Sequence, residues 1–263
     1  MSGSVATPPL IVERLSASYN GALALRDVSF ALETPERLAV IGPNGAGKTT
    51  LFRIISGVQR ARSGRVLVHG HAPGRHICVA YVPQRSEVDW NFPVSVADVV
   101  MMGRAREIGL VRWPGTGDRE RVEEALAQVG IAGLKGRPIG ELSVGQQHRV
   151  FLAQAVAQEA ELALLDEPFT GLDTPSQRAI LDIIDQLQSK GVTVLVATHD
   201  LQLALEHFDR VLLLNRDVIA FGDPEEVLTQ EALFEAYRGH LHLVSDGAGL
   251  AVLDDAHHSE RRS

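Results

Sequence analysis

The feature that most constrains the fold is a short apolar run that stops at a glycine-rich loop. Residues Leu38–Ile41 are all apolar, which is typical of a strand buried on both faces of a parallel sheet. The segment that follows, Gly42–Thr49, matches the pattern G-x-x-x-x-G-K-[ST] at every fixed position. Thr49–Ser56 then predicts a helix, and Gly57 is placed to end it. A strand, a glycine loop and a helix in this order predict an α/β fold.

The glycine-rich loop predicts a site for phosphate groups. Its glycines let backbone N–H groups close around phosphate oxygens, and the helix N-terminus adds about half a positive charge. Lys48 is expected to act in catalysis by neutralising the β- and γ-phosphates, and Thr49 to hold Mg²⁺. The binding residues expected here are Gly42, Pro43, Asn44, Gly45, Ala46, Gly47, Lys48, Thr49 and Thr50. A glycine-rich turn of no consequence is the alternative, and the flanking strand and helix argue against it.

Two acids end a second apolar run, Leu162–Leu165. Burying the carboxylates of Asp166 and Glu167 at the end of such a strand costs free energy unless they contact a cation or water. Because ligands of open parallel sheets bind at the carboxyl ends of the strands, we expect both acids to face the same crevice as the Gly42 loop. Asp166 is placed to support Mg²⁺, and Glu167 to polarise the water that attacks the γ-phosphate. The alternative for Asp166 is a helix cap.

A histidine follows the third apolar strand, Val192–Thr198. A lone histidine at a strand end is usually a surface or capping residue. His199, however, falls at the same sheet edge as the two motifs above. It is therefore a candidate catalytic residue that hydrogen-bonds the γ-phosphate or the attacking water.

The predicted secondary structure divides the rest of the chain into a β-rich core and a helical insertion. Further strands are predicted at Leu10–Ser18, Val28–Leu32, Val66–Val68, Ile77–Val82 and Val211–Leu214. From Asp89 to Ala160 the patterns are helical: a capping box at Ser95–Asp98, a loop at Gly109–Asp118, and helices at Arg119–Val129 and Gln146–Glu159. Thr174 is expected to cap a later helix with Pro175 at its first position, and Gly191 to close it.

These patterns predict one domain over residues 10–240, with its core at about 10–86 and 161–240 and a helical subdomain at about 87–160. Residues 241–263 are expected to be a tail, weakly patterned from Ser245 onward. Hydrophobic residues make up 45% of the 263 residues, enough for a sizeable core. No apolar run approaches the roughly 18 residues of a membrane span, and no secretory signal is evident.

The amino-acid composition also limits the partners of the protein and the cellular compartment in which it can act. A single cysteine, Cys78, excludes an internal disulfide and permits a reducing compartment. The net charge of −8 disfavours a nucleic-acid partner. The histidines lack Cys or acidic neighbours at metal-binding spacing, so solvated surface residues are the favoured interpretation of His69, His71, His76, His240, His242, His257 and His258.

The segment Leu142–Gln146 ends 20 residues before Asp166 and reads Leu-Ser-Val-Gly-Gln. Together with the three strand-end motifs, it resembles the ATP-binding cassette (ABC) ATPases, whose signature usually reads Leu-Ser-Gly-Gly-Gln. The resemblance runs from about Leu10 to Leu228. It implies a P-loop NTPase fold with a mixed β-sheet and an inserted helical subdomain, which hydrolyses ATP with Mg²⁺.

Further residues receive roles from this resemblance. Gln84 resembles the family's Q-loop glutamine, with a role in catalysis and at Mg²⁺. Tyr19 resembles the aromatic residue that stacks on adenine. Thr170–Asp173 resembles the D-loop, which adds Asp173 to the nucleotide-binding set. Val144 departs from the family pattern and disfavours a positive φ, so the signature must use a backbone that valine tolerates.

The signature helix also suggests a second copy of the chain. The helix that starts near Ser143 offers another anion-binding N-terminus, although one nucleotide already has the Gly42 loop. The family implies two cassettes head to tail, each ATP held between one phosphate loop and the opposite signature. Ser143 and Gly145 would then contact the γ-phosphate in trans, with Gln146 beside them.

The segment Tyr81–Arg104 resembles the ATP-binding subunits of bacterial manganese, zinc and iron importers. This implies separate membrane permease subunits, an extracytoplasmic substrate-binding protein acting indirectly, and a place on the cytoplasmic face of the membrane. Trp90 and Phe92 could fill the core of the insertion, or they could help line a groove for a helix of the membrane subunit. The two roles are compatible. Gln84 would link the nucleotide to the insertion.

Rival functions stay open at this point. A similar cassette could serve a metal chelate such as a siderophore or corrinoid. A soluble ABC protein of translation or DNA repair is disfavoured by the single phosphate loop and the lack of sustained heptads. A regulator with negligible turnover is disfavoured because Glu167 and His199 are both present, and an exporter is disfavoured by resemblance alone.

Overall fold

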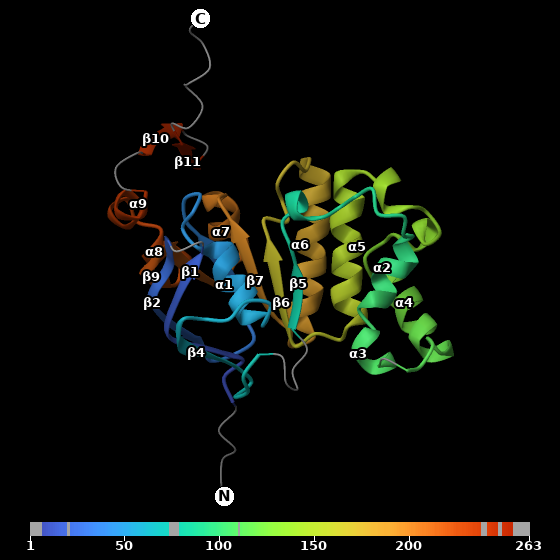
Figure 1. Ribbon diagram of the computed structural model, residues 1–263. Coiled ribbons are helices and arrows are strands. Elements are labelled where there is room, and N and C mark those ends of the chain that lie inside the picture. Colours follow the sequence, from blue (N-terminus) through green and yellow to red (C-terminus); the bar gives the residue numbers. More distant parts are fainter. Residues whose placement is uncertain are drawn as a thin grey trace, which may run out of the picture. The chain divides into compact units, whose positions relative to one another are not determined.

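The computed structural model describes residues 7–19, 22–73, 79–109, 111–237, 241–246 and 249–254. The chain forms two compact units, seen in Figure 1. The first unit comprises residues 1–73 and 195–263, and the second comprises residues 74–194. The expected helical subdomain, 87–160, lies wholly inside the second unit. Ile77 and Cys78 of the predicted strand and His76 lie outside the described residues.

The first unit contains an antiparallel sheet and part of a mixed sheet. The antiparallel sheet has the order β2-β1-β4. The mixed part has the order β7-β3-β8-β9, in which β3 and β8 are parallel and β8 and β9 antiparallel. The bounds are β1 (Leu10–Tyr19), β2 (Ala22–Leu32), β3 (Arg37–Ile41), β4 (Ser63–Val68), β7 (Thr193–Thr198), β8 (Arg210–Asn215) and β9 (Asp217–Gly222). Residues Leu38–Ile41 are fully buried, which confirms the buried parallel strand before the glycine loop.

Short helices complete the first unit. They are α1 (Lys48–Ile55), α7 (Leu201–His207), α8 (Pro224–Val227) and α9 (Gln230–Ala236). Helix α1 starts directly after Gly47, and Gly57 follows it with a φ of 79°, as the sequence predicts. The expected tail, residues 241–263, contains paired strands, β10 (Leu241–Asp246) and β11 (Gly249–Asp254). The second strand includes a short continuous apolar run, Leu250–Leu253, a strand signal that the prediction overlooked.

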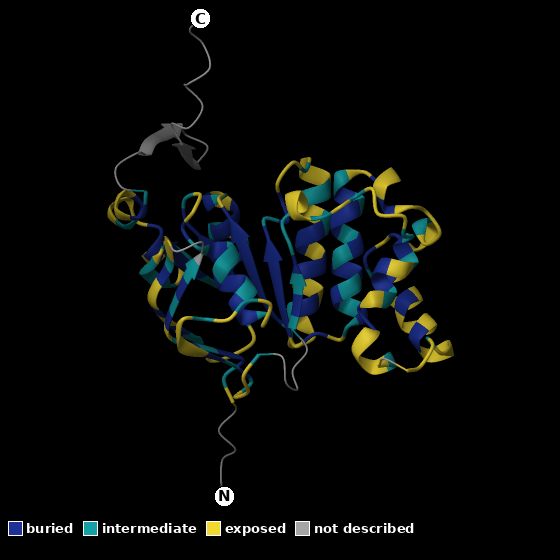
Figure 2. Ribbon diagram, viewed as in Figure 1, coloured by how far each residue is buried: buried dark blue, intermediate teal, exposed yellow. Residues whose placement is uncertain are grey.

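The second unit packs helices around a parallel strand pair. Strands β5 (Val79–Val82) and β6 (Leu162–Asp166) are parallel. The helices are η1 (Arg85–Glu87), α2 (Val96–Met102), α3 (Ala105–Ile108), α4 (Thr116–Gln128), η2 (Ala132–Leu134), η3 (Ile139–Glu141), α5 (Val144–Ala157) and α6 (Thr174–Ser189). Figure 2 shows β6 buried along its length, whereas α4 and α6 keep exposed faces.

Two predicted helix starts need correction. Helix α4 begins at Thr116, inside the predicted loop, because the Asp118 carboxylate accepts a hydrogen bond from Gly115 N at 2.9 Å and caps the helix. Helix α6 is capped by Asp173 rather than Thr174, since the Asp173 Oδ1 accepts from Ser176 N at 3.0 Å. The capping box of Ser95 and Asp98 at the start of α2 is confirmed.

Within the described ranges, none of the helices combines the length and the apolar character needed to cross a bilayer.

Candidate functional site

The glycine loop of the first unit brings backbone segments close together. Gly45 and Gly47 have φ values of 78° and 101°, a left-handed conformation that only glycine adopts at little cost. A Cβ on Gly47 would lie 2.6 Å from the Ala24 carbonyl oxygen, and one on Gly42 would lie 2.0 Å from the Leu214 carbonyl oxygen. A side chain at Gly42 or Gly47 would therefore clash with neighbouring backbone. Such a close approach of backbone segments is typical of a phosphate-binding loop.

Lys48 is the buried cation of this loop. Its side chain is 7% exposed, and its Nζ donates to the carbonyl oxygens of Gly42 at 2.6 Å and Pro43 at 3.3 Å. Thr49 and Thr50 follow on the first turn of α1, both half-buried. The loop thus holds an ammonium group and a helix N-terminus together, two features that favour an anion.

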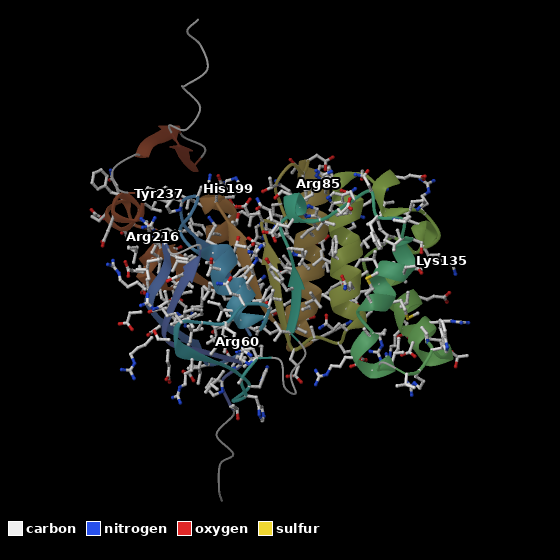
Figure 3. All side chains as sticks on the ribbon, viewed as in Figure 1. Arg60, Arg85, Lys135, His199, Arg216 and Tyr237 are labelled. Atoms are coloured by element: carbon white, nitrogen blue, oxygen red, sulfur yellow. The ribbon has the colours of Figure 1, made fainter. Side chains whose placement is uncertain are left out.

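The two other site residues predicted in this unit lie at strand ends. His199 comes directly after β7 and is exposed, next to the start of α7 (Figure 3). Its neighbour Asp200 caps α7, because the Asp200 carboxylate accepts a hydrogen bond from Leu203 N at 2.9 Å. His199 is therefore not the capping residue of this helix. Tyr19 is the last residue of β1, and its side chain lies outside the described part of the structure.

In the second unit, the structure brings Gln84 and Glu167 together. Gln84 Nε2 donates to Glu167 Oε2 at 3.0 Å, and Thr170 Oγ1 donates to the same oxygen at 3.4 Å. Glu167 has a φ of 53°, a left-handed conformation that costs on the order of 1–3 kcal/mol in a residue other than glycine. Asp166 precedes it, 3% exposed, and its Oδ2 accepts from the Tyr81 hydroxyl at 3.5 Å. Two hydrogen bonds therefore orient the carboxylate of the predicted base.

The signature opens α5 with a capping box. Ser143 is the N-cap, its Oγ accepts from Gln146 N at 3.4 Å, and Gln146 Oε1 accepts from Ser143 N at 3.0 Å. Val144 is the first helical residue, so the departure from the family pattern falls at a position where valine's backbone preference is satisfied. A Cβ on Gly145 would lie 2.9 Å from Ser176 Oγ, so this glycine allows α5 and α6 to pack closely.

Asp173, predicted as a nucleotide-binding residue, has a structural role in this chain. It caps α6, and hydrogen bonds from Ser176 hold the pKa of its carboxyl below the usual value. That the Gly42 loop, Asp166 and Glu167 meet at one nucleotide stays a prediction.

The two aromatic residues predicted near Gln84 behave differently. Trp90 is half-buried, and its ring meets that of Phe151 edge-on at 5.7 Å between centroids. The Arg85 guanidinium lies 5.6 Å from the Trp90 ring centroid, and Trp90 Nε1 donates to the Arg85 carbonyl oxygen at 3.0 Å. Phe92, in contrast, is 56% exposed. Trp90 therefore fills the interior of the insertion, and Phe92 is available on its surface.

Sequence reasoning missed His148, a buried residue of α5. This residue is 7% exposed, and its Nδ1 is buried without a hydrogen-bond partner. Burial lowers the pKa of His148, the hydrogen bond to Pro168 raises it, and nearby Arg85 lowers it again; the net direction is down. A histidine two residues after the signature was the only available signal.

The lowered pKa of His148 predicts an acid-dependent loss of stability. Below the ordinary value of 6.5 the unfolded chain binds a proton that the folded chain does not, so the free energy of unfolding falls as pH falls. In His148→Gln this contribution is absent, and its free energy of unfolding should fall less steeply from about pH 7.5 to about pH 5.5. Urea unfolding at several pH values checks this, and parallel pH curves for the two proteins would contradict it.

Across the described residues, no group of three or more His, Cys, Asp or Glu side chains is arranged to hold a metal ion. His69 and His71 belong to this part of the chain. The other histidines considered above lie outside it or, for His242, have a side chain outside it.

Comparison with known proteins gives the chain its family. A family model described as ABC transporter matches residues 25–170, more than half of the chain. The chain belongs to the ABC transporter family. This ABC protein is 43% identical to the manganese transport system ATP-binding protein MntB of Halalkalibacterium halodurans, over 89% of its own length and 94% of the relative's. It is 45% identical to the zinc transport system ATP-binding protein TroB of Treponema pallidum, over 88% and 87% of the two chains.

Solved structures agree with this assignment. A metal-chelate type ABC transporter in an inward-facing conformation superposes on this ABC protein with a TM-score of 0.79 and 32% identity, covering 90% of this chain and 91% of that one. The ABC-type P-loop NTPase fold with its mixed sheet is thus confirmed, as is the resemblance to the manganese, zinc and iron transport ATPases. ATP binding and hydrolysis are the activity of this family's cassettes.

Proposed function

We propose that this ABC protein is the ATP-hydrolysing subunit of an importer for a transition-metal ion of the manganese, zinc and iron class. The observation that carries the proposal is the near full-length similarity to ATP-binding proteins named for manganese and zinc transport. The segment Tyr81–Arg104 supports it, because the resemblance to this group of importers is concentrated there.

The proposed nucleotide site comprises the residues that the sequence assigns to ATP and Mg²⁺. The Gly42 loop, from Gly42 to Thr50, binds the phosphates of ATP, Lys48 neutralises them, and Tyr19 stacks on the adenine. Thr49, Gln84 and Asp166 carry the oxygen ligands that Mg²⁺ prefers, and the buried carboxylate of Asp166 suits such an ion. When bound, Mg²⁺ supplies neutralisation of phosphate charge.

For hydrolysis, Glu167 acts as the general base. The hydrogen bonds from Gln84 and Thr170 orient its carboxylate, the group that accepts a proton from water in this proposal. His199 is exposed, as a residue that reaches the γ-phosphate or the attacking water must be.

The partners of the protein follow from the same proposal. A second copy binds head to tail, so that Ser143, Gly145 and Gln146 contact the ATP of the partner cassette, with Asp173 near it. Integral membrane permease subunits dock on the helical subdomain, residues 87–160, on the cytoplasmic face of the membrane. An extracytoplasmic binding protein delivers the ion to the permease. Nucleic acid is not among the proposed partners.

A metal chelate is the second candidate substrate. It is favoured by one observation, the superposition on a metal-chelate type ABC transporter at 32% identity. The other rivals, an exporter or a soluble ABC protein, have no such support.

Elemental analysis of cells that lack this protein tests the import proposal. The cells are grown in metal-limited medium and complemented with the wild type or with Glu167→Gln, and manganese, zinc and iron are measured together. A deficit in one metal that only the wild type restores is the expected result. If all three levels are unchanged by the deletion, import of the free ion is wrong; a growth defect confined to medium with a chelate as the metal source would then support the second candidate.

A further inference from the structure

The loop between α3 and α4 presents two large apolar residues to solvent. Val111 is 97% exposed and Trp113 is 89% exposed, the highest exposures of any large apolar residue in the described part of the chain. Figure 2 shows the stretch between these two helices as exposed. Exposed apolar side chains that lie together are typical of an interaction site.

Arginines without ion-pair partners flank these two residues. Arg106, Arg112 and Arg119 are exposed, and none of the three pairs with an acidic side chain of the described residues. Arg112 Nη2 donates to the backbone oxygen of Glu107 at 3.3 Å, a hydrogen bond that leaves its positive charge uncompensated. Residues 104–121 contain five arginines and three acidic residues, a net charge of +2, whereas the whole chain carries −8.

Two of the three acidic residues in this stretch face a buried arginine. Asp118 Oδ1 lies 3.6 Å from Arg104 Nε, and Glu107 Oε2 lies 4.0 Å from Arg104 Nη1. The third, Glu120, is exposed. The charge that this loop presents to solvent is therefore mainly that of its arginines.

The Trp113 side chain stands between a basic hollow and a largely apolar groove. The hollow has a volume of about 510 Å³ and is lined by Trp113 together with Arg104, Arg112 and Arg121. The groove has a volume of about 550 Å³, and Trp113 and Arg119 both line it. Its apolar walls are Met101, Pro114, Val122 and Leu126. Guanidinium groups and apolar surface thus adjoin the same indole ring.

This combination suits a lipid surface better than another protein. Guanidinium groups form paired hydrogen bonds with phosphate, and an indole ring is stable at the boundary between water and hydrocarbon. A protein interface of ordinary size buries about 800 Å² on each partner, far more than two side chains on a loop supply. Contact with a membrane surface needs only a small inserted apolar area when basic residues attract the anionic headgroups.

We propose that the loop from Val111 to Arg119 binds the anionic phosphate headgroups of a membrane surface. Val111 and Trp113 enter the interface between water and lipid. Arg112 and Arg119, each of which lines a hollow together with the indole, bind lipid phosphate. The inference adds a lipid to the partners of the proposed function, and it depends neither on the transported ion nor on hydrolysis.

The fluorescence of Trp113 tests this contact directly. The chain has two tryptophans, so the variant Trp90→Phe emits from Trp113 alone. Vesicles of equal parts phosphatidylcholine and phosphatidylglycerol are expected to shift the emission maximum to shorter wavelength, because the indole leaves water. Vesicles of phosphatidylcholine alone should leave the maximum nearly unchanged, because they carry no net charge.

Two results of this titration contradict the inference. An emission maximum that is unchanged on both kinds of vesicle would overturn it and favour an acidic protein segment as the partner of the loop. An equal shift on both would overturn the role of the arginines, since headgroup charge would then have no influence.

Flotation with the anionic vesicles measures how strongly variants bind. Val111→Ser/Trp113→Ser is expected to lose most of the binding of the wild type. Arg112→Gln/Arg119→Gln should bind about 25-fold more weakly, since one arginine near an anionic surface contributes a factor of about five. Wild-type binding by either double variant would overturn the assignment of its residues to the lipid contact.

Matched controls remove similar side chains elsewhere. Phe234→Ser removes an aromatic residue that is 59% exposed, and Arg178→Gln/Arg216→Gln removes two other exposed arginines. Both should float as the wild type does, and thermal melting reports their folding. Losses equal to those of the loop variants would overturn the inference, because total charge or total apolar exposure would then explain binding. Glu167→Gln should bind vesicles normally, so failure of hydrolysis and failure of lipid binding are distinguishable.

Discussion

The Glu167→Gln variant is expected to bind ATP with nearly wild-type affinity and to hydrolyse it about 10²-fold to 10⁴-fold more slowly, the usual contribution of a general base. Glutamine has the same shape as glutamate but cannot accept a proton from water. Its amide can still hydrogen-bond Gln84 and Thr170, which contact Glu167 Oε2 in the wild type. Only the chemical step should therefore be lost.

Because ATP is retained, the variant should also accumulate as an ATP-dependent dimer. Nucleotide affinity, phosphate release and size-exclusion chromatography with and without Mg-ATP measure the three properties. Glu161→Gln is the matched control: this acid is exposed and precedes β6, whereas Glu167 directly follows that strand. Normal phosphate release by Glu167→Gln would show that another group activates the water.

Replacing Arg104 with methionine is expected to lower the free energy of unfolding by about 3–5 kcal/mol, the usual cost of removing one member of a buried ion pair. The Arg104 side chain is 9% exposed; its Nε lies 3.6 Å from Asp118 Oδ1, and the Asp118 side chain is also 9% exposed. Its Nη1 donates to the Ala157 carbonyl oxygen at 2.9 Å and lies 3.2 Å from Glu159 Oε2. Methionine would leave the Asp118 carboxylate buried without its cation.

Urea unfolding of the variant measures this loss. Arg26→Met is the control, because Arg26 pairs with Asp217 while its side chain is 66% exposed, and removal of such an exposed pair has little effect on stability. The double variant Arg104→Met/Asp118→Asn should recover part of the stability, since asparagine can still cap α4. Equal losses for Arg104→Met and Arg26→Met would mean that burial does not govern the energy of these pairs.

The sequence predicts the local motifs of the site well. The strand before Gly42, the glycine loop and the helix after it form a continuous segment, so spacing alone specifies them. The capping box at Ser95 is equally local. The first residues of helices are harder to predict, because several neighbouring residues are acceptable caps. Asp173 and Thr174 compete at the start of α6, and Asp118 caps α4; only the three-dimensional path of the backbone decides which residue does so.

The features that escaped prediction depend on residues far apart in the chain. Arg104 is buried because Asp118 and Glu159 come to it from α4 and from the end of α5. Trp90 of the loop before α2 packs on Phe151 of α5. None of these partners stands at a helical or strand spacing from the other, so periodicity carries no information about them.

The position of Lys48 bears on how the loop distinguishes nucleotides from small ions. Its ammonium group has already exchanged bulk water for the carbonyl oxygens of Gly42 and Pro43. An incoming anion must therefore compete with two peptide dipoles rather than with water alone. A lone phosphate ion, which contacts few of the loop's N–H groups, gains too little to displace them, whereas a triphosphate reaches the whole loop at once. In the proposed nucleotide site, we therefore expect the resting lysine to favour long phosphate chains over a lone phosphate ion.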